Sequence, residues 1–158
     1  MKKALLVIDV QNDYFPGGKY PLWNTDSCLS NVVKAVKLCK EKGIEVICIK
    51  HVAEQNAPFF NEGSLGVEIH ELLMEEMQNP TIVVKKYADS FYKTQLAEVL
   101  EEKGIEELLI CGMMTQNCVT HTAISKYAEK YRVSIIKECC TTVDKMINEI
   151  AFNAAGIR

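Results

Sequence analysis

The stretch of sequence that decides the fold covers residues 110–123 and reads ICGMMTQNCVTHTA. An apolar run over 107–111, which leads into this stretch, predicts a buried strand. The strand ends at Gly112, and a helix is predicted to begin near Cys118. Unpaired backbone N–H groups and the positive end of the helix dipole favour a thiolate in the first turn of a helix. Cys118 is therefore a candidate nucleophile, although a free cysteine is more often a small apolar filler.

Outward from this stretch, strands and helices alternate along the chain. Short apolar runs predict strands near 4–9, 44–50, 81–84, 106–111 and 133–137. Longer periodic segments predict helices near 26–42, 66–77, 91–103, 117–130 and 144–155. Because the strands are almost continuously apolar, the pattern predicts an α/β fold with three layers, in which helices cover both faces of a doubly wound parallel sheet.

Two further segments place reactive side chains at strand ends. Asp9 follows the first apolar run, and Lys85 and Lys86 follow the third. Open parallel sheets bind ligands beyond the carboxyl ends of their strands. An aspartate, a lysine and a cysteine are therefore expected at one rim of the sheet. The plainer interpretation is a surface ion pair and an unrelated core cysteine.

Three motifs in order resemble the isochorismatase-like cysteine hydrolases, a family that includes nicotinamidases and N-carbamoylsarcosine amidase. The resemblance extends from Ala4 to Val143. Its motifs are Asp9-x-Gln11-Asn12-Asp13, then Lys86-x-x-x-Ser90-x-x-x-Thr94-x-Leu96, and last Gly112-x-x-Thr115-x-x-Cys118-Val119-x-x-Thr122-Ala123.

The resemblance implies a catalytic triad of Asp9, Lys86 and Cys118, with Lys86 preferred to Lys85 because it keeps the spacing to Ser90. It also implies a cis Met113–Met114 peptide bond, an oxyanion hole built from the backbone N–H groups of Met114 and Cys118, and the strand order 3-2-1-4-5. In this scheme Lys86 stabilises the thiolate and Asp9 acts as general base and then acid. Cys118 attacks a carbonyl and forms a thioester that water hydrolyses.

The family's metal-binding pattern is broken in this chain. Nicotinamidases carry an Asp-x-His pair after the second strand, whereas the sequence here is Ile49-Lys50-His51, with His70 as the other histidine near that loop. Two histidines without a carboxylate make a poor zinc or iron site, so we expect neither a metal nor another cofactor. The family's true isochorismatases typically lack the nucleophilic cysteine, so vinyl ether hydrolysis is kept only as an alternative.

The function that remains is hydrolysis of a C–N bond in a small amide, imide or ureide. The candidate pocket residues are Gln11, Tyr14, His51 and Phe59, the last two in a long loop over 51–65 that is expected to set specificity. One alternative is a catalytically silent protein that binds a small metabolite in the same crevice. Another is a redox protein that pairs Cys118 with Cys111 or with Cys139 and Cys140.

Composition agrees with a compact enzyme and not with a nucleic-acid or membrane protein. The 158 residues predict one domain over 1–158, 48% of them are hydrophobic, and the net charge is −3. Seven cysteines without a pairing pattern suggest reduced thiols in the cytoplasm. The expected partner is a small-molecule substrate.

The end of the sequence leads to one more expectation. Family members add a sixth strand after the last helix, and the chain stops at Arg158 before such a strand could form. The strand near 133–137 is then an apolar sheet edge, and such edges pair with another chain or are covered. We therefore expect a homo-oligomer that buries this edge or the helix near 144–155.

Overall fold

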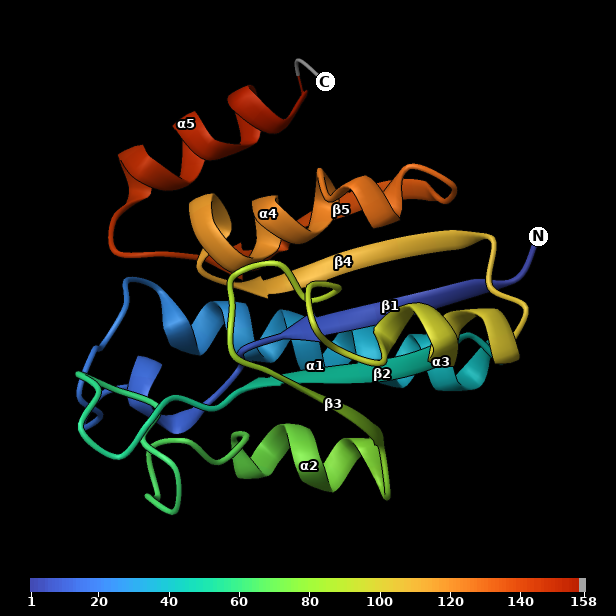
Figure 1. Cartoon of the computed structure of the whole chain (residues 1–158). Coiled ribbons are helices and arrows are strands. Elements are labelled where there is room, and N and C mark those ends of the chain that lie inside the picture. Colours follow the sequence, from blue (N-terminus) through green and yellow to red (C-terminus); the bar gives the residue numbers. More distant parts are fainter. Residues whose placement is uncertain (157–158) are drawn as a thin grey trace.

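Five parallel strands form one sheet through the centre of the computed structural model, which describes residues 1–156 (Figure 1). The strands are β1 (Lys3–Ile8), β2 (Glu45–His51), β3 (Thr81–Lys85), β4 (Glu107–Met113) and β5 (Arg132–Thr141). Their order across the sheet is β3-β2-β1-β4-β5, and every neighbouring pair is parallel. The predicted fold class and strand order are confirmed.

The central strand β1 shows why the apolar runs become buried strands. Every residue from Ala4 to Ile8 is fully buried. In the register of the sheet, Val7 lies between Cys48 of β2 and Cys111 of β4, and both of these are also fully buried. Since helices cover both faces of the sheet, a strand in this position can carry apolar side chains on both sides.

The principal helices are α1 (Thr25–Glu41), α2 (Glu71–Met77), α3 (Leu96–Glu102), α4 (Thr120–Ala123) and α5 (Lys145–Gly156). In Figure 1, α1 lies behind the sheet, α3 and α4 lie in front of it, and α5 lies beside β5. The buried face of α1 is set by apolar residues at helical spacing, such as Leu29, Val32 and Val36. No helix within residues 1–156 is long and apolar enough to span a membrane.

Two predicted helices begin later than the sequence suggested. The predicted helix over 66–77 begins at Glu71, because the backbone before it pairs with the segment after β1. The N–H groups of Asn12 and Asp13 donate to the carbonyls of Glu68 and Gly66, each at 2.9 Å. The predicted helix over 91–103 begins at Leu96, whose N–H donates to Thr94 Oγ1 at 3.2 Å.

The predicted helix over 117–130 is divided into three short pieces. A π-helical turn, η2 (Thr115–Val119), comes first, then α4, and then a 3-10 turn, η3 (Lys126–Ala128). The hydroxyl of Thr120 donates to the carbonyl of Thr115 inside the first turn. Helix α4 ends at Ala123, and Ser125 caps η3 by accepting from the N–H of Tyr127 at 3.3 Å. The segment after β4 is therefore a compact turn around Cys118, not one long helix.

Candidate active site

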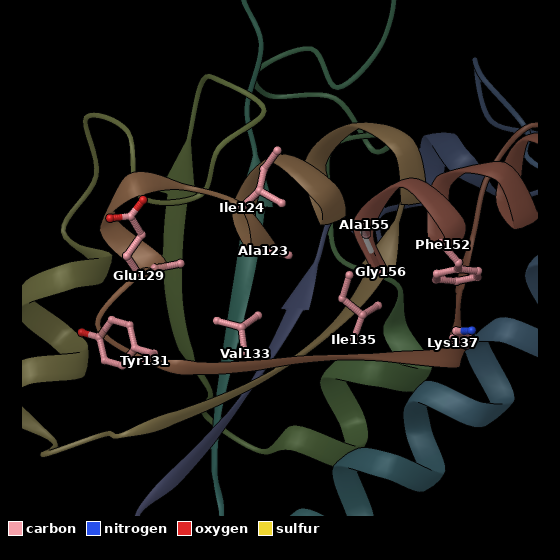
Figure 2. Close-up of a pocket in the computed structure, with 11 residues that line it drawn as sticks. Ala123, Ile124, Glu129, Tyr131, Val133, Ile135, Lys137, Phe152, Ala155 and Gly156 are labelled. Carbon is pink, nitrogen blue, oxygen red and sulfur yellow. The ribbon is translucent and has the colours of Figure 1, made fainter. Parts of the chain in front are cut away.

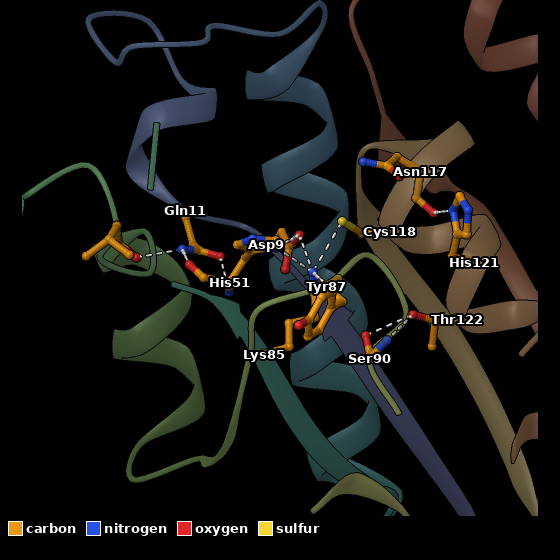
Figure 3. A network of polar contacts seen from close by, with 11 residues as sticks. Asp9, Gln11, His51, Lys85, Tyr87, Ser90, Asn117, Cys118, His121 and Thr122 are labelled. Atoms are coloured by element: carbon orange, nitrogen blue, oxygen red, sulfur yellow. Dashed lines mark hydrogen bonds and ion pairs between the residues drawn. The ribbon is translucent and has the colours of Figure 1, made fainter. Parts of the chain in front are cut away.

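Three strand ends bring Asp9, Lys85 and Cys118 together (Figure 3). Asp9 directly follows β1, Lys85 is the last residue of β3, and Cys118 lies in η2 just after β4. All three side chains are buried. Asp9 has a φ of 53°, so the chain turns sharply at the carboxylate. Left-handed backbone at a non-glycine residue is often found where a functional side chain is held in place.

Gly112 allows β4 to approach β1 at the base of this site. Its φ is 124°, and a Cβ atom built there would lie 2.0 Å from the carbonyl oxygen of Ile8. Only glycine fits at that distance. The turn that carries Cys118, η2, begins three residues later at Thr115, and the Met113–Met114 peptide bond just before it is cis, as the family resemblance implied.

The lysine of the site is Lys85, which corrects the assignment of Lys86. Lys85 is 1% exposed and its ammonium group lies between Asp9 and Cys118, whereas Lys86 is exposed to solvent. Neighbouring residues of a strand point to opposite sides, so only one of the two lysines can face the site. The inward position of Val83 places Lys85 on the buried side. Spacing to Ser90 selected the wrong lysine, and the alternation of β3 identifies the right one.

The Lys85 ammonium is the centre of a buried polar cluster. Its Nζ atom lies close to four groups: Asp9 Oδ2 at 3.0 Å, His51 Nδ1 at 2.9 Å, the Tyr87 carbonyl oxygen at 3.0 Å and Cys118 Sγ at 3.2 Å. Burial by itself lowers the pKa of Lys85, but Asp9 and Cys118 outweigh burial and hold the pKa above its ordinary value. Asp9 and Cys118 therefore favour the charged form of the buried Lys85.

The surroundings of Cys118 favour its protonated thiol form. Burial is the main cause that raises its pKa, Asp9 raises it further, and Lys85 only partly opposes them. The sequence suggested a thiolate stabilised by a helix start and a lysine, and the Lys85 ammonium does donate to Cys118 Sγ, at 3.2 Å. A π-helical turn surrounds the sulfur, and a carboxylate lies close to it. The thiol must therefore lose its proton during the reaction.

Asp9 has an atom suited to receive that proton. Its Oδ2 accepts from Lys85, while its Oδ1 is buried and has no hydrogen-bond partner within residues 1–156. A buried carboxylate oxygen without a partner is costly, and active sites are a common place for such atoms. The thiol sulfur, a carboxylate oxygen of Asp9 and a ring nitrogen of His51 all lie within 4.8 Å of one another.

The four predicted pocket residues have different roles in the structure. Gln11 is fully buried: its Nε2 donates to the carbonyls of His51 and Val67 at 2.8 and 2.7 Å, and its Oε1 accepts from the N–H of His51 at 2.8 Å. It joins the end of β2 to the segment before α2 and uses both of its amide protons within the protein, and its place in the pocket stays a prediction. His51 contacts Lys85, and its side chain is 22% exposed.

Tyr14 and Phe59 belong to an aromatic cluster beside the triad. The Tyr14 ring lies 5.6 Å from that of Phe59 and 4.6 Å from that of Phe60, between ring centroids. Burial, and after it the charges of Asp9 and Cys118, raises the pKa of Tyr14 well above its ordinary range. The phenol is therefore neutral and lies near Asp9 and Cys118. The fully buried Phe60 was not singled out by sequence, although it adjoins Phe59 in the predicted specificity loop.

The remaining motif residues support the site from outside. Thr122 Oγ1 accepts from the N–H of Ser90 at 3.0 Å and donates to the Ser90 hydroxyl at 2.8 Å, which ties the loop after β3 to α4. The side chain of His121 contacts the carbonyl of Asn117 at 2.8 Å and does not reach the buried cluster. Sequence also could not show that the carbonyl of Tyr87 contacts Lys85, because backbone groups carry no sequence signal.

Asp9, His51 and Cys118 are also close enough to suggest a metal site. The Lys85 ammonium, however, lies within 3.2 Å of the donor atom of each of these residues. A cation already at the centre of the donor set repels a second one, so these residues do not fit a resident metal ion.

An open cavity of about 520 Å³ lies elsewhere, at the side of the molecule formed by β5, the end of α4 and α5 (Figure 2). Apolar side chains such as Ile124, Val133, Ile135 and Phe152 make up much of its lining. None of the triad residues contributes to it. We call this cavity the β5 groove.

Comparison with known proteins places the chain and its fold in one family. The family described as "Isochorismatase domain" matches residues 3–156. The chain is 37% identical over 150 residues to the uncharacterized isochorismatase family protein YddQ of Bacillus subtilis, which covers 94% of this chain and 83% of that protein. It is 27% identical over 158 residues to nicotinamidase 3 of Arabidopsis thaliana, with coverages of 92% and 76%.

Solved structures agree with these matches. The crystal structure of nicotinamidase PncA from Bacillus subtilis has a TM-score of 0.87 at 25% identity, and the match covers 99% of this chain and 97% of that one. The fold and the matches thus define a hydrolase. The chain belongs to the isochorismatase-like family and is an enzyme of that family.

Proposed function

We propose that the protein hydrolyses a C–N bond in a small amide, imide or ureide, with Cys118 as nucleophile, Asp9 as general base and acid, and Lys85 as the cation that stabilises both. The observation that carries this proposal is the position of the Lys85 ammonium, 3.0 Å from Asp9 and 3.2 Å from Cys118 in a buried site. Buried charges are costly, and a neutral apolar core would serve stability as well.

The first half of the reaction forms a thioester. The S–H proton of Cys118 passes to Asp9 Oδ1 as the sulfur attacks the substrate carbonyl carbon. The backbone N–H groups of Met114 and Cys118 are the proposed donors to the oxyanion. When the tetrahedral intermediate collapses, the C–N bond breaks and the departing nitrogen takes the proton from Asp9. Ammonia or an amine leaves, and the acyl group stays on the sulfur.

The second half returns the enzyme to its starting state. A water molecule attacks the thioester carbonyl while Asp9 takes one of its protons. The C–S bond then breaks, the carboxylic acid product leaves, and the proton returns from Asp9 to the sulfur. Lys85 keeps its three protons throughout, and its role is to balance the negative charge as it moves between Asp9 and Cys118.

Ammonia release from a panel of small primary amides and ureides tests this proposal. We expect turnover by the native enzyme and by Lys86→Met, and none by Cys118→Ala. Equal release by Cys118→Ala would reject Cys118 as nucleophile. Ligand binding without turnover across the panel would favour a silent binding protein instead. In that case the chain would retain the family fold and lack the chemistry.

The sequence-based expectations of a small-molecule substrate and a cytoplasmic location remain proposals of the same kind. Each of the seven cysteines is free and buried, which fits a reducing compartment.

A further inference from the structure

The Lys85 ammonium has more neighbours than protons. An ammonium group donates three N–H bonds, and four groups lie within 3.2 Å of Nζ. The carbonyl of Tyr87 and the carboxylate of Asp9 can only accept. The third proton is therefore shared between His51 Nδ1 and Cys118 Sγ.

This arrangement fixes the protonation of His51. A ring nitrogen 2.9 Å from an ammonium nitrogen must accept, so Nδ1 carries no proton and the neutral ring carries its proton on Nε2. Burial lowers the pKa of His51 and the nearby Lys85 lowers it further, while Asp9 opposes them. Burial and the charge of Lys85 thus favour the neutral form that the geometry requires.

The second ring nitrogen has no partner in the protein. His51 Nε2 makes no hydrogen bond within residues 1–156, and the only buried side-chain nitrogen or oxygen atoms there without a partner are Asp9 Oδ1 and Tyr131 Oη. His51 Nε2 must therefore reach open space, in agreement with the 22% exposure of the side chain. The ring connects the buried ammonium to the accessible side of the site.

The backbone of His51 is also held firmly. Gln11 accepts from its N–H and donates to its carbonyl, both at 2.8 Å, and the residue pairs with Lys85 in the register of β2 and β3. The ring of Phe60 lies beside the imidazole, at 5.8 Å between centroids. A ring held in this way presents its N–H in a fixed direction, which is what selective recognition needs.

We propose that His51 is a substrate-binding residue whose Nε2–H donates a hydrogen bond to a second acceptor on the substrate, beside the carbonyl attacked by Cys118. This inference rests on the proposed hydrolase function and narrows it. Asp9 and Lys85 balance each other and His51 is neutral, so the site has no net charge to attract an anion. The favoured substrate is a neutral amide with a second carbonyl oxygen, as in diamides, imides and ureides.

The tautomer of His51 can be measured without any substrate. In ¹⁵N-histidine-labelled enzyme, we expect His51 to show a protonated Nε2 and an unprotonated Nδ1 from pH 5.5 to pH 8. His121 serves as an internal contrast, because its Nδ1 lies 2.8 Å from the carbonyl of Asn117 and must donate to it. A His51 ring that is an imidazolium at pH 7, or that carries its proton on Nδ1, would overturn the proposal.

Matched amides test the substrate side. Malonamide has a second carbonyl and butanamide does not, and we expect the native enzyme to prefer malonamide. His51→Leu also removes an acceptor from Lys85, so hydrolysis of both amides should fall, but the KM for malonamide should rise about tenfold more than the KM for butanamide, the usual magnitude for one lost hydrogen bond. His51→Gln, which can also accept and donate, should recover most of the loss.

Equal losses on both amides in His51→Leu would contradict the substrate contact and indicate a role through Lys85 alone. If the proposed hydrolase function is wrong, neither amide is hydrolysed. Binding of malonamide to the Cys118→Ala protein then tests whether His51 contacts the ligand. Binding weakened about tenfold by adding His51→Leu supports the contact, and unchanged or absent binding rejects it.

Discussion

The buried cluster around Lys85 and the β5 groove differ in nearly every physical respect. The cluster is buried and charged, and Cys118 is 2% exposed, while the groove is open, largely apolar and about 520 Å³ in volume. Cavity size alone would place the function in the groove. Buried charges that do not help folding are instead typical of catalytic sites. An apolar hollow on the surface is typical of a site that binds another molecule.

The largest expected effect separates two adjacent lysines. Lys85→Met leaves the Asp9 carboxylate buried without its counter-charge, and we expect a loss of about 3–5 kcal/mol in the free energy of unfolding, together with the loss of hydrolysis. Lys86→Met is the matched control and should change stability by about 0.5 kcal/mol or less. Urea unfolding and ammonia release measure both. Equal effects of the two changes would mean that the cluster is not organised around Lys85.

The base of the cluster should be sensitive to one methyl group. Gly112→Ala places a Cβ atom 2.0 Å from the carbonyl oxygen of Ile8, and we expect destabilisation by about 2–4 kcal/mol. Gly43→Ala is the control, because Gly43 also has a positive φ, 68°, but nothing lies within 4 Å of the added atom. Its cost should stay near about 1 kcal/mol. A Gly112→Ala protein as stable as the control would show that β1 and β4 can separate there.

The protonation of Cys118 gives a pH prediction. Its pKa is raised, so the reactive thiolate is a minor form at neutral pH and grows about tenfold with each pH unit. Alkylation by iodoacetamide, followed by peptide mass spectrometry, should therefore speed up continuously from pH 6 to pH 9. A plateau below pH 8 would indicate the stabilised thiolate that the sequence suggested. Lys85 lowers this pKa, so Lys85→Met should slow alkylation further at every pH.

We expect substitutions in the β5 groove to have the smallest effect on activity. Within residues 1–156, β5 pairs only with β4, and exposed Arg132 and Glu138 lie along it. Antiparallel pairing of β5 with a second copy, centred on Ile135, would bring each arginine opposite a glutamate. We therefore propose that a second copy covers this edge.

Light scattering at tens of micromolar tests the second copy. The native protein should form a dimer, and Ile135→Asp should form monomers with hydrolysis changed by less than about twofold, since the groove lacks the triad. A native monomer would contradict the proposal, as would a dimer that Ile135→Asp leaves intact.

Sequence reasoning succeeded where local pattern determines structure. Apolar runs predicted the five strands, and strand ends predicted the positions of Asp9 and Cys118. Prediction from the sequence failed where contacts with distant segments determine the local structure. The segment over 66–69 pairs with residues after β1 instead of extending α2. The resting state of Cys118 depends on burial and on a carboxylate more than a hundred positions away in the sequence.

The choice of Lys86 over Lys85 could have been avoided from the local sequence pattern alone. Counting from Ser90 followed the family motif, whereas the alternation of β3 places Val83 and Lys85 inside and Val84 outside. The contact between His51 and Lys85 had no sequence signal, because the register of β2 and β3 creates it.

The most direct test of the central claim is to trap the covalent intermediate. The enzyme is mixed with an amide that it hydrolyses, and the reaction is quenched in acid within the first turnovers. The mass of the peptide that contains Cys118 is then measured by mass spectrometry. We predict an added mass equal to the acyl group on Cys118, absent in Cys118→Ala and lost on treatment with hydroxylamine. Rapid turnover with no acyl group on Cys118, or with the group on another residue, would contradict it.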